Sequence, residues 1–186
     1  MVSLRDLLGF GESSGRERES SSGSRTVDEI LSELRTMQPA EARYLAAFAY
    51  TLSRPARADL DISESETRAM EETIARFGKL DPDRARLVVR MVKERSVLFG
   101  STEDFIVTRI FKELSTPKQR EELLHCLFAI SGADGVISVP EEEVIRQVAY
   151  ELDFDHAAYI AIRSQYAKLR EVLRDLPGKG EPDESE

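Results

Sequence analysis

The chain has 186 residues and a formal net charge of −9, from 35 acidic and 26 basic side chains. This length suits one domain with tails rather than two domains. The acidic balance argues against nucleic-acid binding, because contact with phosphates needs clustered lysine and arginine. The single cysteine, Cys126, cannot form an internal disulfide and lies in an apolar run, which suits a reducing compartment. We therefore expect a one-domain protein of the cytoplasm.

Residues 1–10 form a short amphipathic stretch. Its large apolar side chains recur at helical spacing, at Leu4, Leu7, Leu8 and Phe10. Arg5 and Asp6 interrupt it, which is atypical of a signal peptide. Such a stretch can contact a membrane surface, here the inner membrane, without crossing it, and a frayed terminus with no role is the alternative. Residues 11–25, GESSGRERESSSGSR, contain no apolar side chain and predict a flexible linker.

Between residues 26 and 176 every strong periodicity is helical. Apolar residues recur every three or four positions in the segments 26–37, 40–53, 64–78, 82–98, 102–115, 117–131, 139–152 and 155–176. No segment alternates with period two over the length of a strand. The sequence therefore predicts an all-α fold, a single compact bundle with short connections. The Pro/Gly-rich acidic residues 177–186 are predicted to be disordered.

A shift of 75 residues aligns two parts of the bundle with each other. ADLDISESETRAMEETIARF (58–77) falls on ADGVISVPEEEVIRQVAYEL (133–152), so that Asp59 meets Asp134 and Glu66 meets Glu141. Identity falls on the turn, and similarity falls on the apolar face of the helix that follows. We predict two pseudo-equivalent units of three helices each.

The first unit spans about 40–98 and the second about 117–176. The helix at 102–115 joins them, which makes a bundle of about seven helices after the first helical segment at 26–37. The whole helical domain covers 26–176.

This pattern resembles the TerB-like domain of bacterial tellurite-resistance proteins, to which the N-terminal domain of the DjlA co-chaperones is related. The resemblance covers roughly residues 40–170, and its most specific element is SGADGVISVPEEEVIRQVA (131–149). FIVTRIFKEL (105–114) matches the connecting helix. Membership implies a compact all-helical domain, acidic residues that bind a divalent cation such as calcium, and a part in membrane-linked stress or chemical-defence complexes.

The resemblance carries Asp134 and Glu141 over as cation ligands, together with Asp59 and Glu66 of the first copy. Leu60 departs from the pattern, because the second copy has a glycine, Gly135, at that place. Asp61 crowds the same first turn and completes the predicted set of cation ligands: Asp59, Asp61, Glu66, Asp134 and Glu141. Carboxylate oxygens are hard ligands that favour Ca²⁺ or Mg²⁺ over zinc. The spacing does not fit an EF-hand loop.

Helix capping is the structural alternative for the same residues. Ser63 with Glu66 and Ser138 with Glu141 each fit a capping box, in which the two side chains satisfy amides at a helix start. An aspartate in such a turn also bonds its own backbone.

Enzymatic activity is not expected. GESSG at 11–15 matches the G-x-S-x-G pattern of a nucleophile elbow, but no predicted strand precedes it. The two histidines, His125 and His156, share no metal-ligand spacing.

Two kinds of function remain. The first is a cation-binding module in tellurite or stress resistance that scaffolds partner proteins, near the membrane. The second is a metal-free protein-interaction adaptor or co-chaperone-like module. The sequence lacks the His-Pro-Asp tripeptide of J-domains, so recruitment of a chaperone by that route is excluded.

Overall fold

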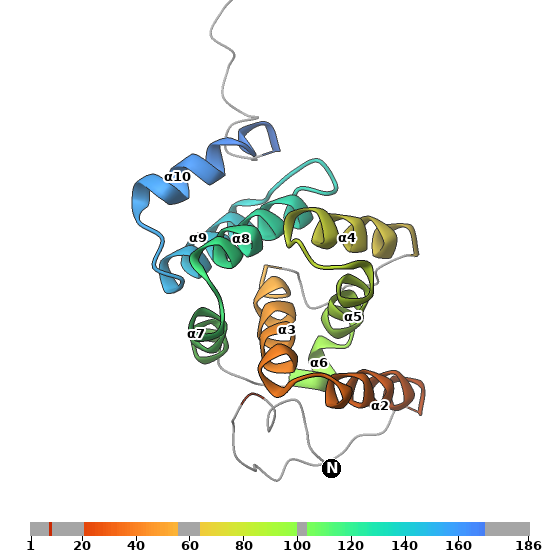
Figure 1. Cartoon of the computed structure of the whole chain (residues 1–186). Coiled ribbons are helices and arrows are strands. Elements are labelled where there is room, and N and C mark those ends of the chain that lie inside the picture. The colour runs from red at the N-terminus through yellow and green to blue at the C-terminus, as the bar shows by residue number, and fades with distance from the viewer. Residues whose placement is uncertain (1–7, 9–20, 56–63, 100–103, 170–186) are drawn as a thin grey trace, which may run out of the picture.

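The computed structural model describes residues 8, 21–55, 64–99 and 104–169 and shows an all-α protein (Figure 1). Nine α-helices and one 3-10 turn occur in these ranges, and no β-strand does. They are α2 (Ser21–Thr36), α3 (Pro39–Leu52), α4 (Glu64–Phe77), α5 (Pro82–Lys93), α6 (Arg95–Phe99), α7 (Asp104–Leu114), α8 (Pro117–Ser131), α9 (Val139–Glu151), α10 (His156–Ser164) and η1 (Ala167–Leu169). The predicted all-α fold is confirmed.

Helix α3 is the centre of the packing. Every residue from Leu45 to Leu52 is buried, and the principal neighbours of the helix are α5, α7 and α8. Figure 1 shows α3 between α5 and α7, with α8 near one end. Three alanines in this run present only methyl groups, which lets neighbouring helices approach closely. Phe48 anchors α7, because its ring meets that of Phe111 edge-on at 5.9 Å between centroids.

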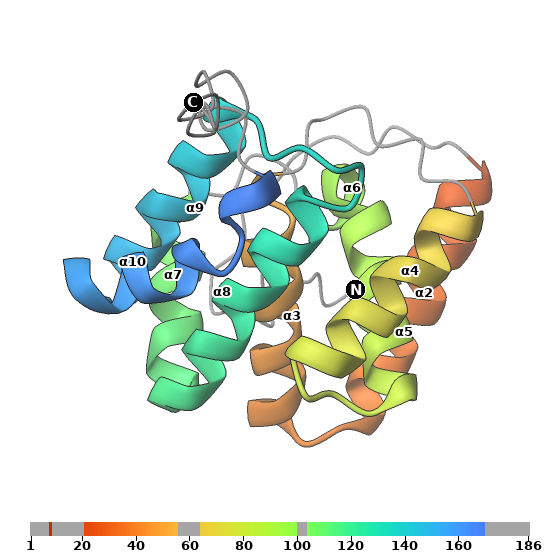
Figure 2. The same ribbon diagram turned by 90° about the horizontal axis from the view of Figure 1, so that it is seen from above.

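The remaining helices cover this centre. Helix α4 packs on α5 and α8, α9 packs on α8 and α7, and α10 packs on α8 (Figure 2). Thus α4 packs on the third helix of its predicted unit, whereas the main neighbours of α9 are the first helix of its own unit and the connecting helix α7. This difference gives no support to the predicted internal repeat, which stays a prediction.

Three boundaries differ from those predicted. Helix α2 begins at Ser21, inside the segment predicted as a linker, because its buried Ile30 and Leu34 fix a helix that extends towards its N-terminus. The segment 82–98 is split at Glu94, whose φ of −92° and ψ of 18° end α5. In the segment 155–176 the α-helix α10 ends at Ser164 and the 3-10 turn η1 follows, while residues 170–176 lie outside the described ranges.

Bonds from residue i to residue i−3 tighten the chain after α10. The amide of Tyr166 donates to the carbonyl of Arg163, and that of Leu169 donates to the carbonyl of Tyr166. This tighter path lets the Tyr166 ring stack on Phe128 at 5.0 Å between centroids.

Of the amphipathic stretch 1–10, the structure describes only Leu8. Its side chain is 2% exposed and belongs to the hydrophobic core, so a membrane contact through this stretch would have to be made without it. None of the described helices combines the length and apolarity needed to cross a bilayer. The predicted disordered tail, 177–186, lies outside the described residues.

Candidate functional site

The turn between α8 and α9 carries the second pair of predicted cation ligands. One carboxylate oxygen of Asp134, Oδ1, accepts a hydrogen bond from the amide of Val136 at 3.1 Å. Gly135 follows with a φ of 92°, a conformation that suits glycine. The aspartate is exposed and shapes its own turn.

Glu141 closes a capping box with Ser138. The Ser138 hydroxyl accepts from the amide of Glu141 at 3.4 Å, and the carboxylate oxygen Oε2 of Glu141 accepts from the amide of Ser138 at 2.9 Å. The capping alternative is therefore confirmed at this turn. The second oxygen of each carboxylate, Asp134 Oδ2 and Glu141 Oε1, bonds no side chain or backbone group in the part of the chain that the structure describes.

The other predicted ligands do not join this pair among the described residues. Asp59 and Asp61 lie outside the described ranges. Glu66 is exposed in the first turn of α4. Within residues 21–55, 64–99 and 104–169, no three His, Cys, Asp or Glu side chains are grouped to hold a metal ion. The complete set remains a prediction.

A buried charged centre, which the sequence analysis missed, joins α3 to α7 and α9. Arg54, just after α3, has a side chain that is only 2% exposed. Its Nη1 donates to Thr108 Oγ1 at 2.7 Å and to Glu151 Oε2 at 2.5 Å, and its Nη2 donates to Glu151 Oε1 at 3.2 Å. The two-pronged contact satisfies the Glu151 carboxylate where water has little access.

Asp104 extends this centre towards the surface. Its Oδ1 accepts from the hydroxyl of Tyr50 at 2.7 Å, and its Oδ2 lies 3.7 Å from Arg54 Nε. Burial and the bond to Asp104 raise the pKa of Tyr50 to about 12, so the phenol stays protonated at neutral pH. These groups hold the end of α3 against α7 and α9, which is a structural role.

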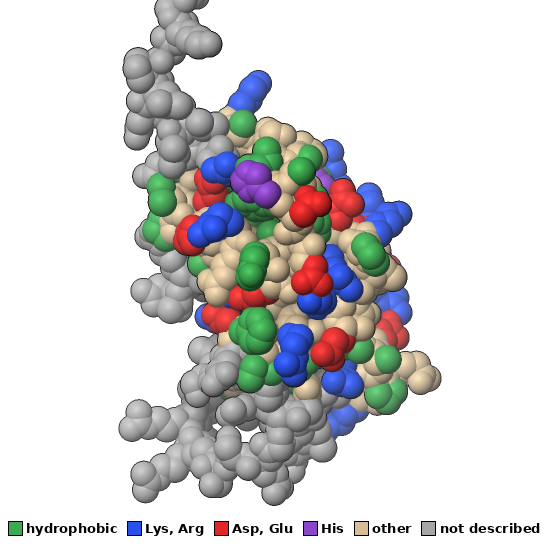
Figure 3. All heavy atoms as spheres, turned by 90° about the vertical axis from the view of Figure 1, so that its left-hand side faces the viewer, with side chains coloured by type: hydrophobic (Ala, Val, Ile, Leu, Met, Phe, Trp, Pro, Cys, Tyr) green, Lys and Arg blue, Asp and Glu red, His purple; other side chains and the backbone are tan. Residues whose placement is uncertain are grey.

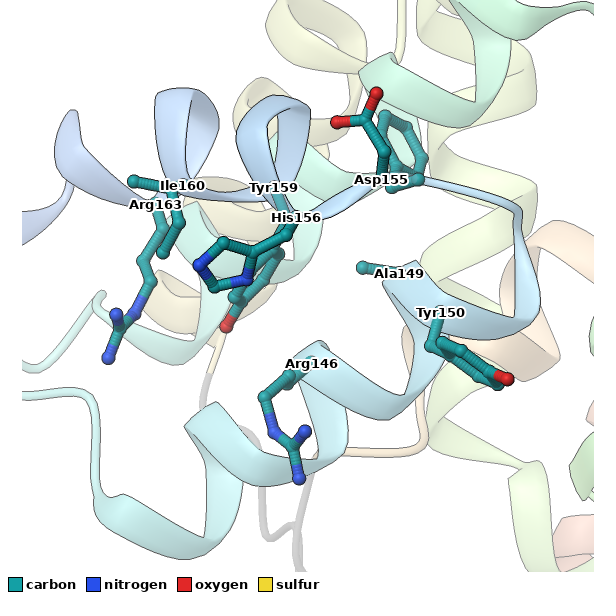
Figure 4. A pocket seen from close by; sticks show the side chains of 9 residues that line it. Arg146, Ala149, Tyr150, Asp155, His156, Tyr159, Ile160 and Arg163 are labelled. Atoms are coloured by element: carbon teal, nitrogen blue, oxygen red, sulfur yellow. The ribbon is translucent and has the colours of Figure 1, made fainter.

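A cleft of about 430 Å³ opens between α9 and α10 (Figure 4). Its apolar lining comes from both helices and the loop between them, at Ala149, Phe154, Tyr159 and Ile160. In Figure 4 Arg146 of α9 and Arg163 of α10 extend on the same side of the cleft, with His156 between the helices. We call this the α9–α10 cleft. It combines an apolar surface with a cationic rim.

Glutamates of α9 hold both rim arginines. Nε of Arg163 donates to Glu142 Oε1 at 2.6 Å, and Nε of Arg146 donates to Glu143 Oε2 at 3.0 Å. The bond from Arg146 lowers the pKa of Glu143, so this pair is charged at neutral pH. The Arg146 pair is exposed on both sides, which makes it easy to exchange for another carboxylate.

Two exposed aromatic residues stand beside the cleft. Tyr150 is 82% exposed and lines both the α9–α10 cleft and a second cleft of about 350 Å³ towards α7. Phe105 of α7 is 57% exposed and lines the second cleft. We call Phe105, Tyr150 and the two clefts the aromatic face. Figure 3 views the molecule from the left-hand side of Figure 1 and shows hydrophobic side chains there among acidic and basic ones.

Comparison with known families decides the assignment that the turn motif suggested. The family model described as tellurite resistance protein TerB matches residues 44–164. The chain belongs to the TerB family. This confirms the resemblance identified in the sequence. Neither a curated protein nor a solved structure matches the chain.

The TerB match runs from within α3 to the last residue of α10. It therefore contains the charged centre, the α8–α9 turn and the lining of the α9–α10 cleft. Helix α2 and the 3-10 turn η1 lie outside it. Sequence reasoning found the turn through its repeated pattern, whereas the cleft gave no motif, because its lining comes from spaced positions on two helices.

Proposed function

We propose that this TerB-family chain is a non-enzymatic module of tellurite-type stress resistance that binds a partner protein through the aromatic face. The observation that carries the proposal is Tyr150, which is 82% exposed between two clefts. Exposed aromatic side chains beside an apolar hollow are typical of surfaces that bind other proteins. Tyrosine and phenylalanine also bury a large area at a small entropic cost.

The chemistry of the α9–α10 cleft favours a partner segment with an apolar side chain next to a carboxylate. The apolar side chain would cover Tyr159 and Ile160, and the carboxylate would bond Arg146 or Arg163 at the rim. It would compete with Glu143 for Arg146, an exchange that costs little because exposed ion pairs are weak.

The reactive side chains support a role other than catalysis. The two histidines line different clefts, His156 the α9–α10 cleft and His125 a cleft between α4 and α8. Cys126 is buried, and burial raises the pKa of its thiol, which keeps it in the unreactive protonated form.

Survival on tellurite tests the proposal. In a bacterial strain that lacks the chain and is sensitive to tellurite, the wild-type chain should restore growth, and the double variant Phe105→Ala/Tyr150→Ala should not. Val97→Ala is the matched control, because Val97 is also exposed, at 59%, but lies on α6. Thermal unfolding of each purified variant checks that loss of growth does not reflect loss of fold.

Two outcomes would contradict the proposal in different ways. If the double variant restores growth as well as the wild type, the aromatic face is not the binding surface. If the wild-type chain has no effect on survival, the role in tellurite resistance is wrong, whatever the surface does.

A divalent cation at the α8–α9 turn is the second candidate function. The favouring observation is that Asp134 Oδ2 and Glu141 Oε1 have no partner among the described residues, although the other oxygen of each carboxylate is used. They are hard ligands of the kind that Ca²⁺ takes, usually about six to eight at a time. Asp59, Asp61 and water would supply the rest. After chelation, the full chain should melt at a higher temperature when Ca²⁺ or Mg²⁺ is added.

A further inference from the structure

A separate cleft of about 280 Å³ lies between α4, α8 and the end of α10. Phe77 and His125 line it, and their rings stack with 6.2 Å between centroids. Gln165, directly after α10, lines its edge. Neither the charged centre nor the aromatic face uses this cleft, which we call the α4–α8 cleft.

Three cations stand around the α4–α8 cleft: Arg76, Lys79 and Lys118. The guanidinium of Arg76 lies over the Phe77 ring, 5.1 Å from its centroid. In the described part of the chain, none of the three forms an ion pair with a carboxylate, whereas Arg84, Arg90 and Arg163 each do. These three cations therefore stand without a direct carboxylate partner there, although the chain as a whole has a net charge of −9.

Two glutamates also line the cleft, and both belong to α8. Glu121 Oε1 lies 3.9 Å from His125 Nε2. The charge of Glu122 acts on Tyr44 and Cys126, where it adds to burial in raising the pKa of each, so it is directed partly towards the core. Three cations against two acids leave the lining with a formal charge of +1.

We propose that the α4–α8 cleft binds the acidic segment 177–186 of the same chain. This segment, PGKGEPDESE, carries four carboxylate side chains and one lysine. The described chain stops at Leu169, four residues after Gln165 on the edge of the cleft. The eight steps along the chain from residue 169 to residue 177 can span up to about 27 Å.

Covalent attachment makes such binding feasible although each contact is weak. Exposed ion pairs contribute less than about 1 kcal/mol each, and a tethered segment meets its site at an effective concentration in the millimolar range. Binding of this kind is salt-sensitive and reversible. The segment 177–186 would cover the cleft until a competing anionic segment displaces it.

Paramagnetic relaxation in the full chain tests this proposal. A nitroxide is attached at Ser185→Cys, since Cys126 is buried. The amide resonances of residues 76–79 and 118–125 should then broaden at low salt and recover in about 1 M NaCl, where the screening length falls to about 3 Å. Arg76→Gln/Lys118→Gln should abolish the broadening. The matched control Arg86→Gln/Arg109→Gln removes the same charge from exposed residues elsewhere and should leave it unchanged.

Three results would overturn the proposal. The first is an absence of broadening at these residues, and the second is broadening centred on the α9–α10 cleft instead. The third is broadening that appears only when a nitroxide-labelled chain is mixed with a separate isotope-labelled chain, because the segment would then bind a second copy. Amide spectra of each variant without the label show whether the fold is kept.

Discussion

The α8–α9 turn and the charged centre around Arg54 hold their carboxylates in opposite ways. At the turn, Asp134 and Glu141 accept bonds from backbone amides close to solvent. In the centre, the side chain of Glu151 is 5% exposed and bonds the guanidinium of Arg54. A capping residue contributes about 1 kcal/mol to the free energy of unfolding, whereas a buried charge strongly destabilises the fold once its partner is removed. Burial, rather than the density of acidic residues along the chain, decides which carboxylates the fold depends on.

The largest expected effect follows from removing the cation of the buried pair. Arg54→Met keeps much of the side-chain volume but leaves Glu151 without its partner in a site that excludes water. We expect the free energy of unfolding to fall by about 3–5 kcal/mol. Urea denaturation at pH 7, followed by circular dichroism, measures the change.

The double variant Arg54→Met/Glu151→Leu is the matching control. It removes both charges, so the cost of burying an unpaired carboxylate disappears, and we expect most of the lost stability to return. If Arg54→Met lowers the free energy of unfolding by less than about 1 kcal/mol, water reaches Glu151. The charged centre and the α8–α9 turn would then not differ in how much the fold depends on their carboxylates.

A middle-sized effect is expected at the turn. Ser138→Ala removes the hydroxyl that accepts from the Glu141 amide and should lower the free energy of unfolding by about 1 kcal/mol. Ser138→Asp, which retains a capping oxygen, should restore most of the loss in the same denaturation experiment. Equal losses in both variants would show that the hydroxyl acts by something other than capping.

The sequence predicted the turn well because its contacts are local. Ser138 and Glu141 are three residues apart along the chain. Gly135, the glycine of the Ala-Asp-Gly motif, has the positive φ that favours glycine in a turn. Apolar spacing likewise located most of the described helices to within a few residues, except that α2 began early, the segment 82–98 was split into α5 and α6, and α10 ended early.

The charged centre was missed because its contacts are distant in sequence. Arg54 meets Glu151 across 97 positions and Thr108 across 54, and no local pattern reports such pairing. One signal was present: Glu151 lies three residues after Val148, on the apolar side of α9. A charged residue at such a position implies a buried partner, although it does not say which residue that partner is.

The smallest expected change in stability gives the sharpest test of the turn's chemistry. Asp134→Asn keeps an oxygen that can accept from the Val136 amide, and Glu141→Gln keeps one for the Ser138 amide. Both substitutions therefore preserve capping and remove charge. In the presence of a chelator, each variant should unfold within about 0.5 kcal/mol of the wild type.

The two substitutions separate cation binding from capping when Ca²⁺ or Mg²⁺ is then added. If the carboxylates bind the cation, the wild type gains melting temperature and both variants lose most of that gain, because an amide oxygen is a weaker ligand for a hard cation than a carboxylate. If the wild type shows no gain, the turn only caps α9. A gain of equal size in all three proteins would place the cation elsewhere, away from Asp134 and Glu141.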